Sequence, residues 1–195
     1  MGQQAGGASV HYHLLSPLSR GLFNRAVSMS GSALCWWASI KRPLEKTKKL
    51  ARLLKCPYKK RENTETPEEM KDMLDCLKSK DMETLMNTHP NFYEWRHLEQ
   101  AQEPVTAFSP RVDPESSMAF MPAEPIDLMK QGNFQHVPWI VGITDDEGAF
   151  KISSMFHDLK SLNELQDQFE KLGPLMLGFH DGQCEAPKIN AQKVI

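Results

Sequence analysis

The residues with the spacing of a catalytic motif lie at the start of the chain, in the run Gly2-Gln3-Gln4-Ala5-Gly6. In the pattern Gly-x-Ser-x-Gly, glycines two residues before and two after a serine permit a sharp strand-to-helix turn that exposes the serine as a nucleophile. Gly2 and Gly6 occupy the two glycine positions, but Gln4 occupies the serine position. An amide cannot be deprotonated at accessible pH and cannot form an ester that turns over, so the motif lacks its nucleophile.

A second group of reactive residues follows a strand signal much later in the chain. Residues 137–144 form an apolar run bounded by turn residues, which is typical of a central parallel strand covered on both faces. The run leads directly into Asp145-Asp146-Glu147-Gly148. Acidic groups at the carboxyl end of a parallel strand are where open α/β sheets place functional residues.

The glycine-rich start, His11-Tyr12-His13 behind it and the run from Ser16 to Ser32 together resemble one known family. This long stretch is similar to the type-B carboxylesterases, the cholinesterase-like branch of the α/β-hydrolases, and most of all to the insect members. The resemblance implies an α/β fold, a partial α/β-hydrolase fold built from the central portion of a mostly parallel sheet with flanking helices. Residues 1–195 are then expected to be a partial carboxylesterase domain that starts at the nucleophile elbow and ends before the catalytic histidine region.

The resemblance also implies roles for individual residues. Glu147 matches the family's triad acid, Gln4 stands at the nucleophile position, and the backbone N–H of Ala5 matches one donor of the oxyanion hole. The alternative is that Glu147 is a solvated carboxylate at the end of the strand. We interpret Asp145 and Asp146 in this way. The role of Ser30 stays open, because it either matches a family serine near the acid or is an ordinary strand-end hydroxyl. His157 and His180 follow Glu147 in the chain, but neither is surrounded by the residues that flank the family's catalytic histidine.

The four cysteines are Cys35, Cys56, Cys76 and Cys184, and their spacing contains no Cys-x-x-Cys zinc pattern. No metal and no cofactor is therefore expected. By resemblance, Cys56 and Cys76 close the family's small disulfide loop, with two reduced buried thiols as the alternative. We do not expect Cys35 to pair with Cys184. A disulfide, together with the resemblance, points to a secreted or secretory-pathway protein.

Composition narrows the range of partners. The 195 residues include 23 basic and 25 acidic side chains, a net charge of −2, which offers no electrostatic argument for binding nucleic acid or a membrane surface. No apolar run approaches the ~20 residues of a membrane span. The resemblance implies small carboxylic esters as the substrates of active relatives.

Periodicity and capping signals place the secondary structure. Ala5–Leu15 is expected to form a helix that ends at Ser16-Pro17, and Arg25–Ser30 a short buried strand that ends at Gly31-Ser32. The residues from Thr66 to Glu69 are typical of a capping box, with Pro67 in the first turn of the helix. Further helices are predicted over residues 43–55, 67–78, 81–86, 125–131 and 161–173, the second of these burying Met70, Met73, Leu74 and Leu77.

Three hypotheses about function remain open. The first is a carboxylic-ester hydrolase that acts through an acyl-enzyme. The second is a non-catalytic pseudoenzyme that keeps the fold for ligand binding or adhesion. The third is a truncated gene product without an independent role. Gln4 favours the second or third over the first.

Overall fold

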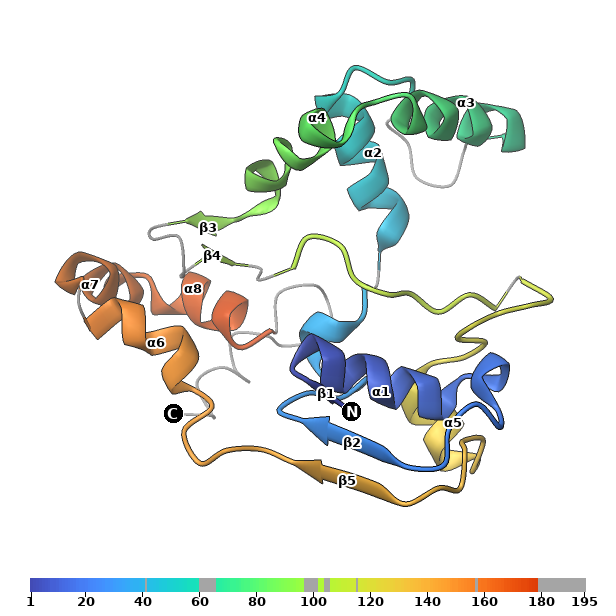
Figure 1. Cartoon of the computed structure of the whole chain (residues 1–195). Helices are drawn as coiled ribbons and strands as arrows, with labels where there is room; N and C mark the ends of the chain where they lie inside the picture. Colours follow the sequence, from blue (N-terminus) through green and yellow to red (C-terminus); the bar gives the residue numbers. More distant parts are fainter. Residues whose placement is uncertain are drawn as a thin grey trace. The chain divides into compact units, whose positions relative to one another are not determined.

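Three short parallel strands form a sheet in the computed structural model of the chain (Figure 1). The strands are β1 (Gly2–Gln3), β2 (Ala26–Met29) and β5 (Trp139–Gly142), and they lie in the order β1-β2-β5. Both pairings are parallel. Since parallel neighbours need a crossover connection, helix α1 (Ala5–Leu15) links β1 to β2. The predicted α/β class is confirmed.

The structure describes residues 1–40, 42–59, 66–96, 102–103, 106–114, 116–156 and 158–178. The chain divides into two units: unit 1 comprises Met1–Ile40 and Ser109–Ile195, and unit 2 comprises Lys41–Phe108. Each unit is considered separately below.

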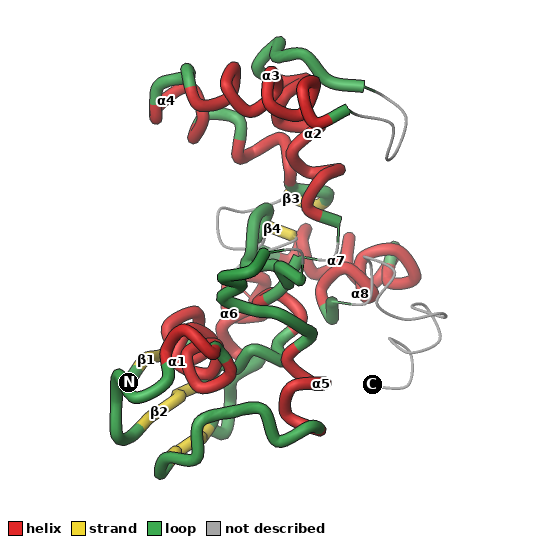
Figure 2. The backbone as a smooth tube through the Cα atoms, turned by 90° about the vertical axis from the view of Figure 1, so that its right-hand side faces the viewer, coloured by secondary structure: helices red, strands yellow, loops and turns green. Residues whose placement is uncertain are grey.

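Helix α1 lies along β1 and β2, as Figure 2 shows. Its buried face joins one hydrophobic cluster, and the Tyr12 hydroxyl donates to the carbonyl of Ala38 over 2.5 Å. The helix ends where the sequence predicts, because Pro17 cannot continue it and instead opens the short 3₁₀ helix η1 (Pro17–Ser19). The buried members of the cluster are Ala8, Tyr12, Leu15, Ala33, Ala38, Met121 and Leu128.

Strand β5 differs from its prediction as a central strand covered on both faces. Within the described residues β5 pairs only with β2, and it forms one edge of the sheet. Ile140, Val141 and Ile143 are 70%, 57% and 79% exposed. An apolar run shows that a strand is suited to burial on both faces, but it does not identify the segment that covers it.

Among the remaining elements of unit 1, α5 lies close to its predicted bounds, η2 and α6 are not predicted from the sequence, and one predicted helix needs correction. The predicted helix over residues 161–173 is two helices, and Asp158, not Ser161, caps the first by accepting hydrogen bonds from the N–H groups of Lys160 and Ser161. Aspartate is among the most favoured N-cap residues, and with Asp158 as the cap the helix begins before the predicted start at residue 161. The elements are η2 (Trp36–Ala38), α5 (Pro125–Lys130), α6 (Ala149–Phe156), α7 (Leu159–Asp167) and α8 (Phe169–Met176).

Unit 2 is built from short helices and a small antiparallel pair of strands. Helix α3 begins at a complete capping box: the Thr66 hydroxyl accepts from the N–H of Glu69, and the Glu69 carboxylate accepts from the N–H of Thr66. This confirms the predicted cap and both predicted bounds of the helix. The elements are α2 (Pro43–Leu53), α3 (Pro67–Lys78), α4 (Met82–Met86), η3 (His89–Phe92), β3 (Trp95–Arg96) and β4 (Gln102–Glu103).

The buried face of α3 is narrower than predicted. Met73 and Leu77 are buried, but Met70 and Leu74 are 44% and 46% exposed. Met73 and Leu77 lie one turn apart and meet Ala51 of α2, whereas Met70 and Leu74 form a neighbouring stripe on the same helix. The contact between the two helices is therefore one stripe wide.

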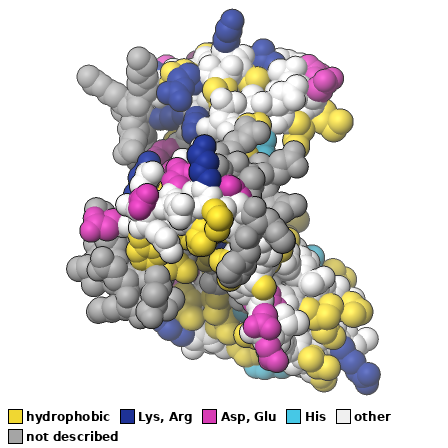
Figure 3. Space-filling view, turned by 90° about the vertical axis from the view of Figure 1, so that its left-hand side faces the viewer, with side chains coloured by type: hydrophobic (Ala, Val, Ile, Leu, Met, Phe, Trp, Pro, Cys, Tyr) yellow, Lys and Arg dark blue, Asp and Glu magenta, His cyan; other side chains and the backbone are white. Residues whose placement is uncertain are grey.

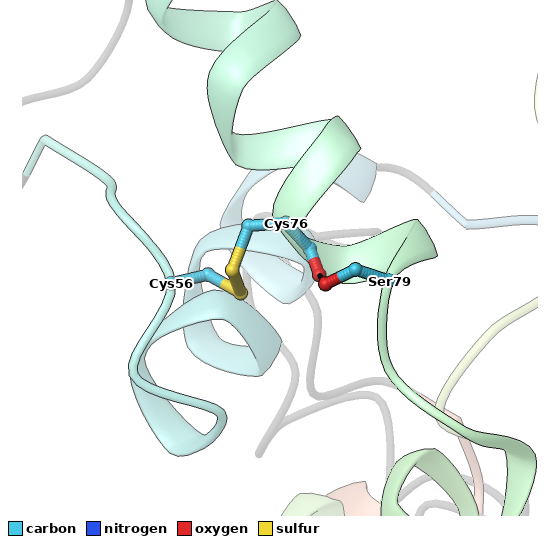
Figure 4. Close-up of a disulfide and its surroundings, with 3 residues drawn as sticks. All are labelled: Cys56, Cys76 and Ser79. Atoms are coloured by element: carbon cyan, nitrogen blue, oxygen red, sulfur yellow. Dashed lines mark hydrogen bonds between the residues drawn. A yellow bond between two sulfur atoms is a disulfide. The ribbon is translucent and has the colours of Figure 1, made fainter.

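A disulfide joins the end of α2 to α3 (Figure 4). Cys56 follows α2 and Cys76 lies within α3, and their Cα atoms are 5.8 Å apart. Cys56 is buried in the same cluster as Ala51, Met73 and Leu77. This is the pairing that the family resemblance implies. Cys35 is a free thiol, and Cys184 lies outside the described residues.

Candidate active site

Gln4 adopts the backbone conformation of a nucleophile elbow. Its φ of 49° and ψ of −113° lie in a region that residues other than glycine rarely occupy. Backbone hydrogen bonds hold the turn on both sides, because the N–H of Gln4 donates to Met29 over 2.8 Å and its carbonyl accepts from Ala8 over 2.9 Å. The Gln4 side chain is exposed at the junction of β1 and α1.

Glycines let other backbone segments approach this turn. A Cβ atom on Gly31 would lie 2.1 Å from the carbonyl oxygen of Gln4, and a Cβ on Gly2 would lie 2.3 Å from the carbonyl of Gly6. Both contacts are with backbone atoms, which cannot rotate away as a side chain can. From the sequence, Gly31 is expected only to end a strand, whereas in the structure it also lets the backbone approach the turn at Gln4.

Ala5 follows the elbow as the first residue of α1. The N–H groups in the first turn of a helix have no intrahelical acceptor, so that of Ala5 is available to another group. Ala5 is also exposed. Its position therefore suits a donor to developing negative charge at a substrate oxygen.

Glu147 lies in the turn after β5 and is held by three hydrogen bonds. Its Oε1 accepts from the Ser30 hydroxyl over 2.5 Å, and from both the N–H and the hydroxyl of Thr144 over 2.9 Å each. The Ser30 hydrogen bond, and then those of Thr144, lower the pKa of Glu147 below its usual value. The carboxylate is therefore oriented and kept ionised at neutral pH.

Ser30 connects the elbow to the acid. It follows β2 with a φ of 55°, and its N–H donates to the carbonyl of Gly142, the last residue of β5, over 2.9 Å. Its hydroxyl reaches Glu147, while Met29 just before it accepts from Gln4. Gln4 and Glu147 thus lie at the carboxyl ends of β1 and β5, on either side of the end of β2, which is where open α/β sheets place their sites.

His11 is a packing residue in this structure. Its Nδ1 lies 3.2 Å from the backbone N–H of Ala33, from which it accepts a hydrogen bond, and its ring centroid lies 4.7 Å from that of Trp139. Burial lowers the pKa of His11, which favours the neutral ring that this hydrogen bond requires. No local sequence pattern predicts these contacts, because Ala33 and Trp139 are distant from His11 in the chain.

A buried hydroxyl network lies beside this histidine. Trp139 Nε1 donates to Ser28 Oγ over 3.1 Å, and Ser28 Oγ donates to the carbonyl of Gly7 over 3.0 Å. The network ties β5, β2 and α1 together beneath the elbow. No signal in the sequence singles out Ser28, because a serine within a short strand is unremarkable until its partners are known.

No general base is identified within the described residues. There, the hydrogen-bond partners of Glu147 are Ser30 and Thr144, and all three of their donors reach Oε1. His157 and His180, the downstream histidines considered from the sequence, lie outside the described residues. Across the described ranges, no group of three or more His, Cys, Asp or Glu side chains is placed to hold a metal ion. None of the helices described is long and apolar enough to cross a membrane.

Comparisons with known proteins show the family of the chain. The sequence profile of the family described as "Carboxylesterase family" matches residues 1–187. The chain belongs to the carboxylesterase family. Its three strands and their flanking helices are accordingly part of an α/β-hydrolase fold, as predicted.

The relatives of this carboxylesterase-family chain include several insect esterases. The chain is 38% identical to Venom carboxylesterase-6 of Apis mellifera over 179 residues, which are 92% of the chain and 30% of the relative. It is 34% identical to Esterase FE4 of Myzus persicae, with 92% of the chain and 28% of the relative covered. It is also 34% identical to Juvenile hormone esterase of Tribolium castaneum, with 90% and 29% covered. The chain thus spans about three tenths of the length of these relatives.

Proposed function

We propose that this chain keeps the substrate-binding geometry of a carboxylesterase site but does not hydrolyse esters. The observation that carries the proposal is Gln4 in the elbow conformation, with φ 49° and ψ −113°. The turn that presents a nucleophile is retained, while the residue presented cannot attack a carbonyl carbon. The relatives are esterases by name, among them Venom carboxylesterase-6 and Juvenile hormone esterase.

Each of the other site residues has a role within this proposal. Glu147 takes the place of the triad acid, and the N–H of Ala5 is one donor of the oxyanion hole. The three donors on Oε1 of Glu147 support this assignment, because a triad acid must be ionised and held in one orientation. Residues 1–195 would then form part of a single carboxylesterase domain. The disulfide supports an oxidising, secretory compartment for it.

Binding without turnover is therefore the favoured function. A strained backbone at a residue other than glycine costs about 1 to 3 kcal/mol and persists only where its surroundings impose it. The elbow keeps that strain although Gln4 gains no nucleophilic chemistry from it. An exposed amide, which both donates and accepts hydrogen bonds, suits a bound ester or carboxylate.

The test compares the unaltered chain with Gln4→Ala and Gln4→Ser variants of the same length. We expect none of the three to hydrolyse a short-chain aryl ester above the uncatalysed rate, and none to be labelled by an organophosphate. The serine variant stays inactive because a serine hydroxyl needs a positioned base, and within the described residues Glu147 orients no histidine. Ester binding, followed by ligand-detected NMR, should weaken in Gln4→Ala.

Turnover by the unaltered chain well above that of Gln4→Ala would overturn the proposal. If only the Gln4→Ser variant turned over, a base would be present that the described residues do not reveal. His157 and His180 would then be the first residues to substitute.

A further inference from the structure

Positive charge is concentrated in the first part of unit 2. From residue 42 to residue 59, Glu45 is the one acidic residue in the sequence. From residue 66 to residue 83, acidic residues outnumber basic ones. The two halves of the unit therefore differ in sign although the whole chain carries a net charge of only −2. The cations of the first half are Arg42, Lys46, Lys48, Lys49, Arg52, Lys55 and Lys59.

Helical spacing aligns several of these cations. Arg42 precedes α2, and Lys46, Lys49 and Arg52 follow at intervals of four, three and three residues, which places them on one face of the helix. At a rise of 1.5 Å per residue the row extends over about 15 Å. Exposed Lys55, just beyond the helix, continues it. Figure 3 shows several Lys and Arg side chains on the surface of unit 2.

Within the described residues, ion pairs form near the two ends of the segment from residue 42 to residue 59. Glu45 pairs with Arg42 over 3.3 Å, and Glu69 pairs with Lys59 over 2.9 Å. Lys46, Arg52 and Lys55 make no ion pair with any residue in the described part of the chain. We call Lys46, Lys49, Arg52 and Lys55 the basic face of α2.

Lys49, in the middle of the basic face, is affected by its neighbours. Its ammonium lies 5.0 Å from the centroid of the Phe92 ring, a contact that fixes the side chain. Burial lowers the pKa of Lys49, repulsion by Lys46 and Arg52 lowers it further, and Glu94 acts in the opposite direction. Cations that repel one another gain most when an anion binds between them.

We propose that the basic face of α2 binds an extended sulfated polysaccharide. A linear polyanion matches a straight row of cations, because each sulfate can meet a successive side chain and release bound counterions. The chemistry is complementary in charge and does not depend on the ester site, which lies in unit 1.

Two observations favour a polysaccharide over other polyanions. Among the described residues of unit 2, the exposed large apolar side chains are Met70, Leu74, Met82, Met86 and Phe108, and none of them comes from α2. The basic face thus lacks the apolar flank with which an amphipathic helix enters a membrane. The Cys56–Cys76 disulfide indicates an oxidising compartment, where sulfated polysaccharides occur and nucleic acids are scarce.

The test measures binding of the full chain to heparin, used as the probe, at low salt and at increasing salt concentrations. The variant Lys46→Gln/Arg52→Gln/Lys55→Gln removes three cations from the basic face. The control Lys71→Gln/Lys78→Gln/Lys80→Gln removes three from α3 and its end, so both variants have the same net charge. We expect the first to bind on the order of tenfold more weakly, with a shallower salt dependence, and the control to bind nearly as the unaltered chain does.

Equal loss in both variants would overturn the proposal, since net charge would then explain binding. Absence of heparin binding by the unaltered chain would also overturn it, including the case in which phosphatidylserine vesicles bind instead. If circular dichroism shows that the triple variant has lost helix content, the single Arg52→Glu variant decides the question by the same criterion, with Lys80→Glu as its control.

Discussion

The elbow end of unit 1 and the disulfide-closed helices of unit 2 are stabilised in different ways. In unit 2 the capping box of α3 and the Cys56–Cys76 bridge involve residues close in sequence. At the elbow, Gln4 and Ser30 have positive φ values, and segments from three separate parts of the chain hold them in place. The site therefore depends on close backbone approach, while unit 2 depends on local stabilising interactions.

The largest expected effect comes from removing the disulfide. Replacing Cys56 and Cys76 together by alanine should destabilise α2 and α3 by about 3 kcal/mol, because the open loop regains conformational entropy in the unfolded chain. Native-state hydrogen exchange of the amides of both helices in the full chain measures the loss. Cys35→Ala is the matched control, since Cys35 is a free thiol. Unchanged exchange in α2 and α3 would show that local packing alone holds unit 2.

The second-largest effect is expected from a substitution that crowds the backbone of the elbow. Gly31→Ala should destabilise unit 1 by about 2 kcal/mol, as overpacking does, because the added Cβ would lie 2.1 Å from the Gln4 carbonyl oxygen. Gly148→Ala is the control, since a Cβ there has no neighbour within 4 Å. Urea denaturation followed by tryptophan fluorescence compares the two variants. Equal midpoints would mean that the elbow yields easily and is not held by close approach.

The sequence predicts the α-helices of unit 2 well because their signals are local, but it predicts neither η3 nor the pair of strands β3 and β4. A threonine, a proline and a glutamate within four residues determine how α3 begins, and their hydrogen bonds are those expected. The predicted burial of four side chains of α3 is wrong for two of them, because no local pattern shows how wide the contact between α3 and α2 is. Met70 and Leu74 are apolar and correctly spaced, yet they lie outside the stripe that meets α2.

The candidate site is predicted only in part, for a physical reason. The glycine spacing predicts the sharp turn at Gln4, and the family resemblance, not the position of the carboxylates, selects Glu147 among the three acidic residues that follow β5. The contacts that join them are long-range: Ser30 and Glu147 are 117 residues apart, and Ser28 and Trp139 are 111 residues apart. Pairings over such distances follow from the register of the parallel strands, which a single sequence does not encode in any local pattern.

A smaller effect is expected from removing the capping box at the start of α3. Thr66→Ala should destabilise α3 by about 1 kcal/mol, because the N–H of Glu69 loses its acceptor. Thr66→Ser keeps the hydroxyl and should restore most of the difference. Hydrogen exchange in the first turn of α3 reports the change. If alanine and serine behave alike, the capping box contributes little beside the disulfide.

The smallest expected effect concerns ionisation at the site. The hydrogen bond from Ser30 is the largest cause of the lowered pKa of Glu147, so Ser30→Ala should raise that pKa toward its ordinary value of 4.5. The sign for stability follows, since a carboxyl whose pKa is depressed by folding stabilises the fold above its unfolded pKa and loses this contribution as pH falls through the folded pKa. The unaltered chain should therefore keep the contribution to a lower pH than the variant does. NMR titration of the Glu147 carboxyl carbon measures both values, with Ser9→Ala as the control because the Ser9 hydroxyl donates to Ala5 within α1. An unchanged titration midpoint in Ser30→Ala would show that Thr144 alone holds the acid, and the link between the end of β2 and Glu147 would then be structural only.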